Sequence, residues 1–103
     1  MLIEYKNHSI QKICTNASSA TEKYGPEMAE KIHLRIDQIK ASDNVEQMIL
    51  FHIGRCHGLQ GKRKNQYAMD LVHPQRLIFE KIGSKIQIAK IIEITDYHGK
   101  ERG

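Results

Sequence analysis

The chain has 103 residues, a formal net charge of +4 and two cysteines, and this length predicts one domain over residues 1–103. Residues 1–6 lack the apolar region of a signal peptide, and the longest purely apolar run, residues 48–51, is too short to cross a bilayer. We therefore expect a cytoplasmic protein without membrane association. Cys14 and Cys56 lack CxxC spacing, so we expect two reduced thiols and no disulfide framework.

The amino-terminal half predicts one strand and two helices. Residues 2–5 alternate apolar and polar positions, as a strand does, and residues 9–24 repeat apolar positions at helical spacing. The stretch 15–19 is rich in side chains that compete for backbone hydrogen bonds, so this helix is expected to fray or break there. Pro26 suits the start of a second helix, which reaches about residue 41 and turns polar residues such as Arg35 to water. Residues 45–51 predict either a short helical turn or an irregular packed segment.

The carboxy-terminal half predicts three strands, over residues 66–72, 76–82 and 86–94. Two short turns, His73-Pro74-Gln75 and Gly83-Ser84-Lys85, connect them. Such tight connections favour antiparallel neighbours, because parallel neighbours need long crossovers. The expected fold is α+β with the order β-α-α-β-β-β, in which two helices pack on one face of a mainly antiparallel sheet.

The excess positive charge is concentrated between residues 52 and 76, while the rest of the chain is balanced. A phosphate-binding surface has this character, but so does a solvated loop, and charge alone does not separate them. The basic residues are Arg55, Lys62, Arg63, Lys64 and Arg76, and the one acidic residue is Asp70.

The residues around the basic stretch supply the groups needed to cleave RNA without a metal ion. Imidazole is suited to proton transfer because its ordinary pKa of about 6.5 lies near working pH. The sequence offers Tyr97 and His98, directly after the last strand, as proton-transfer candidates, and Arg76, Arg63 and His57 as phosphate contacts. Since Arg76 opens a strand antiparallel to the last one, we expect it at the sheet end where Tyr97 and His98 follow.

Each of these residues also has a structural explanation. In that explanation His98 is a solvated tail residue, Tyr97 caps the sheet, and Arg76 pairs with Glu80. Residues 62–64 then form an ordinary solvated turn. A metal site built from His52, Cys56, His57 and His73 matches no standard zinc spacing, so we expect neither metal nor cofactor.

Taken together, these segments resemble the HigB-like branch of the RelE/ParE toxin superfamily of bacterial toxin–antitoxin pairs. Residues 57–63 read HGLQGKR, where that branch has histidine-x-leucine-lysine-glycine-x-arginine. An aromatic strand with Tyr67 follows, and the chain returns as arginine-apolar-x-phenylalanine over residues 76–79. The segment Asp96-Tyr97-His98 matches the terminal aspartate-tyrosine-histidine of the branch.

The resemblance implies a microbial-ribonuclease-like fold that enters the ribosomal A site and cleaves mRNA during translation. It assigns proton transfer and positioning to His98 and Tyr97, the transition-state charge to Arg76, and phosphate contacts to His57 and Arg63. Asp96 would support them. Gln60 stands where the branch often has lysine, a loss that Lys62 or Lys64 could offset.

The resemblance also implies a cognate HigA-like antitoxin as partner, with operator DNA contacted only through the toxin–antitoxin complex. Two other functions remain open. One is a ParE-like protein of the same fold that inhibits DNA gyrase by protein contact. The other is a basic module that binds nucleic acid or a partner without turnover.

Overall fold

The computed structural model describes residues 1–96, so the predictions for Tyr97 and His98 lie outside the described residues. Five strands form one sheet in the order β1-β5-β4-β3-β2. β1 pairs with β5 in parallel, and the other neighbours are antiparallel. The predicted α+β class with a mainly antiparallel sheet is confirmed. The strands are β1 (Leu2–Tyr5), β2 (His57–Gly58), β3 (Gln66–Asp70), β4 (Arg76–Ile82) and β5 (Ile88–Thr95).

The helices follow the local capping signals of the sequence. The expected break near residue 16 is confirmed: Asn16 is extended, ends α1 (His8–Thr15) and caps α2 (Ala17–Tyr24) by accepting a 3.0 Å hydrogen bond from the Ser19 N–H. Pro26 opens α3 (Pro26–Ala41), as predicted. Residues 45–50 form α4 (Val45–Leu50), which decides between the two alternatives for that segment.

The order of elements is richer than the predicted β-α-α-β-β-β. Two 3₁₀ turns, η1 (Ile53–Arg55) and η2 (Gly61–Arg63), flank the two-residue strand β2. The second predicted strand, over residues 66–72, ends at Asp70, and the last one runs from Ile88 to Thr95 instead of 86 to 94. Elements of two or three residues carry no periodic pattern, so the sequence alone did not predict η1, β2 or η2.

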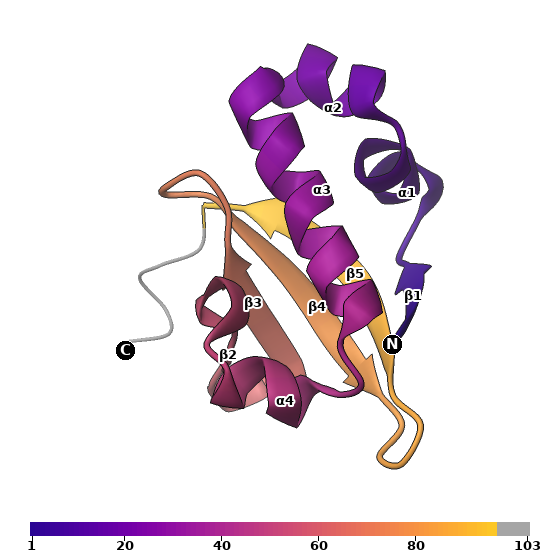
Figure 1. Ribbon diagram of the computed structural model, residues 1–103, viewed down its shortest axis with the longest axis vertical. Helices are drawn as coiled ribbons and strands as arrows, with labels where there is room; N and C mark the ends of the chain where they lie inside the picture. The colour runs from indigo at the N-terminus through magenta and orange to yellow at the C-terminus, as the bar shows by residue number, and fades with distance from the viewer. Residues whose placement is uncertain (97–103) are drawn as a thin grey trace.

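The helices place the main core on one face of the sheet. α3 lies across this face in Figure 1, and Ile32, Ile36 and Ile39 on it are buried with Phe79 and Ile91 of the sheet. We call this the covered face. A smaller cluster on the opposite face, the open face, consists of Ala68 and Ile78 under Leu59, with Ile92 at its side. Over residues 1–96, no helix is long and apolar enough to cross a membrane.

Candidate functional site

Arg76 lies at the end of the sheet that the strand order predicts. It is the first residue of β4, directly opposite Asp70 of β3 and Thr95 of β5. We predicted that the start of β4 and the end of β5 lie at the same end of the sheet. The pairing of Arg76 with Thr95 confirms this prediction for the chain up to Thr95. The catalytic roles of Tyr97 and His98 remain predictions, because these residues are outside the described range.

The Asp70 carboxylate joins two guanidinium groups. Arg55 donates from Nε to Oδ2 at 2.6 Å and from Nη2 to Oδ1 at 3.4 Å. Arg76 Nε lies 3.4 Å from Oδ1. The hydrogen bond to Asp70, reinforced by its charge, raises the pKa of Arg55. One carboxylate therefore holds two guanidinium groups close together.

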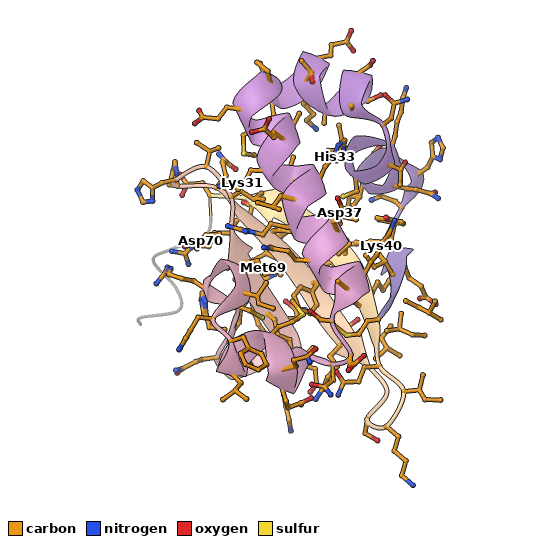
Figure 2. All side chains as sticks on the ribbon, in the orientation of Figure 1. Lys31, His33, Asp37, Lys40, Met69 and Asp70 are labelled. Carbon is orange, nitrogen blue, oxygen red and sulfur yellow. The ribbon has the colours of Figure 1, made fainter. Side chains whose placement is uncertain are left out.

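A third arginine reaches the same residue from the covered side. Arg35 of α3 donates from Nε to the backbone carbonyl of Asp70 at 2.6 Å and from Nη1 to Gln38 Oε1 at 2.9 Å. Burial lowers the pKa of Arg35, and the charge of Asp70 opposes that effect. The expectation that Arg35 points to water is wrong, because this hydrogen bond keeps the side chain half-buried against β3. Figure 2 labels Asp70 and Met69 at this end of β3.

The backbone of η1 is shaped to fit over Arg35. Gly54 has a φ of 57°, and a Cβ at this position would lie 2.7 Å from Arg35 Nε. Any larger residue would be strained there and would also collide with the guanidinium. The glycine thus allows η1 to approach α3 and brings Arg55 to Asp70.

His57 is tied to the same segment. It lies on β2 opposite Ala68, and its Nδ1 is 2.8 Å from the Arg55 carbonyl oxygen. Because a carbonyl oxygen only accepts, Nδ1 carries the proton in this contact, and a neutral ring then has Nε2 as its acceptor nitrogen. The structure therefore brings His57 to the segment that carries Arg55.

Arg63 occupies a neighbouring position on the open face. It donates from Nε to Gln66 Oε1 at 2.6 Å and forms an ion pair with Glu93 of β5. Glu93 is opposite Ile78, two residues along β4 from Arg76. A phosphate would have to compete with Glu93 for this guanidinium. The remaining predicted substrate contacts, Gln60, Lys62 and Lys64 in the η2 segment and Asp96 after β5, are all exposed.

Sequence reasoning assigned no role to Arg55 as a site residue, or to Asp70 and Arg35. The sequence does distinguish Asp70, because it is the one acidic residue in the basic stretch. Nothing in the sequence connects Arg35 with the site, since it lies in a helix far from that stretch. Within residues 1–96, no group of three or more His, Cys, Asp and Glu side chains is arranged to hold a metal ion.

Comparison with solved structures identifies a similar fold. A YoeB/ParE toxin from Agrobacterium tumefaciens superposes with a TM-score of 0.67 at 16% sequence identity, over 95% of this chain and 100% of that chain. No family model matches the sequence. No curated protein matches it either. The structural likeness extends over nearly the whole chain, and at this identity it establishes the fold alone.

Proposed function

We propose that residues 1–103 form the toxin of a type II toxin–antitoxin system, a HigB-like endoribonuclease that cleaves mRNA on the ribosome. The main support is the arginine-rich sheet end, where Arg76 lies opposite Thr95 on a fold shared with a YoeB/ParE toxin. The residues that follow Thr95 in the sequence are Asp96, Tyr97 and His98, the segment that resembles the toxin branch.

The proposed reaction needs no metal. A base removes the proton of a ribose 2′-hydroxyl, the 2′-oxygen attacks the adjacent phosphorus, and the bond to the 5′-oxygen breaks as an acid protonates it. His98 and Tyr97 perform and position the proton transfers. Arg76 stabilises the negative charge that develops on the five-coordinate phosphorus, because its planar fork fits phosphate oxygens and stays charged. His57 and Arg63 contact the phosphates of the bound strand.

The same proposal defines the partners. mRNA in the ribosomal A site is the substrate, which places the activity in the cytoplasm. A HigA-like antitoxin neutralises the toxin, and operator DNA is bound only through the complex of the two. Lys62 and Lys64 add positive charge beside Gln60, which stands where the resembling branch often has lysine.

The test is induced expression followed by mapping of transcript ends. Wild type should arrest growth and produce new transcript ends inside coding regions. His98→Ala and Arg76→Ala should each lower the cleavage rate by about a hundredfold or more, as loss of a group that stabilises transition-state charge does elsewhere. The control is Lys85→Ala, which removes an exposed cation from the β4–β5 turn at the other end of the sheet; it should cleave like wild type. Full toxicity and cleavage in both site variants would refute the assignment.

The second candidate is a ParE-like inhibitor of DNA gyrase, and the name of the similar structure, which includes ParE, favours it over unrelated functions. It predicts intact transcripts, and inhibition of supercoiling by purified protein in a gyrase assay. A basic module without turnover would instead leave both assays unchanged. Its binding to RNA would weaken steeply with salt and would not depend on His98.

A further inference from the structure

The cluster of Arg55, Asp70 and Arg76 carries more charge than its one carboxylate can neutralise. Arg55 and Arg76 both contact the carboxylate, and Arg35 contacts the backbone carbonyl of the same residue. Even with Asp96 counted against them, the three guanidinium groups leave an excess of positive charge. Such an excess at one end of a sheet favours binding of an anion.

The three side chains of the cluster differ in exposure. The Arg76 side chain is 15% exposed, Asp70 31% and Arg55 66%. Arg76 is therefore held within the fold, while Arg55 extends toward solvent from the other side of the carboxylate. Exposed ion pairs add little to stability, so the Arg55–Asp70 pair contributes little to holding the fold together.

The geometry of Arg55 leaves one edge of its guanidinium available. Nε and Nη2 face Asp70, and no hydrogen bond joins Nη1 to any of residues 1–96. Carboxylates and phosphates present similar pairs of oxygens to an arginine fork. Without Asp70, the two positive groups would repel each other and separate.

We propose that Arg55 and Arg76 form a clamp for consecutive phosphates of an RNA strand, and that Asp70 is the residue that positions them. Arg76 binds the phosphate that is cut, and Arg55 binds its neighbour. This inference rests on the proposed function for the identity of the strand. It adds Arg55 and Asp70 to the site and gives the carboxylate two opposing effects. Asp70 fixes the spacing of the two guanidinium groups, and its negative charge weakens binding of the strand.

The first experiment measures how Arg55 contributes to binding. The probe is a short single-stranded 2′-O-methyl RNA, which lacks the attacking hydroxyl and cannot be cut. Its affinity for the full chain is followed by fluorescence anisotropy over a series of salt concentrations. Loss of one phosphate contact should reduce the slope of log K against log salt by about 0.7, and Arg55→Gln is expected to show this change.

The matched control is Lys81→Gln. Lys81 is near the other end of β4 and is ion-paired with Glu46, so this variant also removes one cation from an ion pair. Its slope should equal that of wild type. Arg55→Lys keeps the charge and should keep the slope as well. Equal slopes for Arg55→Gln and Lys81→Gln would overturn the clamp, and so would a wild-type protein that does not bind the probe at low salt.

The second experiment separates the positioning effect of the Asp70 side chain from the effect of its negative charge. Asp70→Asn keeps the shape of the side chain and removes its charge, so it should bind the probe more tightly and cleave RNA more slowly. A purely structural role would lower both affinity and rate. Weaker or unchanged binding would refute the role of Asp70, provided that thermal unfolding shows the variant to be folded. If it is not folded, the Arg55 series decides.

The clamp and the nuclease proposal fail in different ways. Suppose that wild type cuts no transcript, but Arg55→Gln has a smaller slope of log K against log salt than Lys81→Gln. The clamp then stands and the nuclease assignment falls. If transcripts are cut and the slopes are equal, the nuclease assignment stands and the clamp falls.

Discussion

The covered and open faces of the sheet are built from different interactions. On the covered face, which α3 crosses in Figure 1, buried apolar residues of α1, α3 and α4 pack against β3, β4 and β5. On the open face, a small apolar cluster under Leu59 is followed by ion pairs of Arg63, Asp70 and Arg76. Apolar burial stabilises far more than half-exposed ion pairs do. We therefore expect most of the stability to come from the covered face.

The largest expected effect on stability comes from truncating one buried isoleucine on each face of the sheet. Ile91 and Ile78 are both fully buried, Ile91 under the helices and Ile78 under the Leu59 loop. Truncations of this kind cost about 2–5 kcal/mol, least where the surroundings collapse into the space. Ile91→Ala should lose about 4 kcal/mol and Ile78→Ala about 2 kcal/mol in denaturant unfolding. Equal losses would mean that the open-face cluster is packed as rigidly as the main core.

A buried amide on the covered side should have the next largest effect. Gln87, directly before β5, accepts a 2.8 Å hydrogen bond from the Val45 N–H and donates to Glu46 Oε1 at 2.9 Å, and so joins the start of β5 to the start of α4. Gln87→Leu leaves the Val45 N–H without this acceptor and should cost about 1–3 kcal/mol. The exposed Gln11 of α1 offers the control, because Gln11→Leu should stay within about 0.5 kcal/mol of wild type. Similar stabilities for the two variants in thermal unfolding would contradict this role.

Alkaline pH should weaken the covered face through its two thiols. Burial raises the pKa of Cys14 and of Cys56 from 9.0 to about 12. Both stay protonated in the folded protein, while the unfolded chain ionises above pH 9. Their contribution is therefore complete below pH 9 and is lost as the pH rises toward 12. Between pH 9 and 10 the loss should be roughly 1 kcal/mol for each thiol.

The control for this pH effect is a variant that lacks both thiols. Cys14→Ala combined with Cys56→Ala should show a flatter fall in unfolding free energy between pH 9 and 10. An unchanged slope would assign the alkaline loss to other groups.

The smallest expected change in stability is on the open face. Arg63→Gln removes the ion pair with Glu93 and the 2.6 Å hydrogen bond to Gln66. The side chains are partly exposed, so the loss should stay below about 1 kcal/mol and shrink further in high salt. RNA cleavage should fall nonetheless, if Arg63 contacts phosphate. A loss above about 2 kcal/mol would make this pair a structural element and remove the contrast between the faces.

Much of the fold was predictable because its signals are local. Pro26, the helical spacing of the apolar residues and the two tight turns placed α3 and β4 at or close to their observed bounds. Other elements depend on distant residues. α4 begins where Gln87, the residue before β5, accepts a hydrogen bond from the Val45 N–H, and β1 pairs in parallel with β5. Neither the hydrogen bond to Val45 nor the pairing of β1 with β5 leaves a pattern in the sequence of α4 or β1.

The candidate site divides in the same way. The basic stretch and Arg76 at the end of its strand could be read from the sequence, because residue type and strand direction are local properties. Arg35 could not be placed in contact with Asp70, since nothing in its own helix marks it as different from the exposed residues beside it.

By itself, then, the amino-acid order determined which segments become helix or strand and where positive charge gathers, because spacing and turn chemistry act between near neighbours. Only the tertiary structure decided which charges meet. Arg55 and Asp70 are 15 residues apart and Arg35 and Asp70 are 35 apart. Their contacts exist because η1 folds back over α3 at Gly54, and a long-range approach of this kind is set by packing of the whole chain.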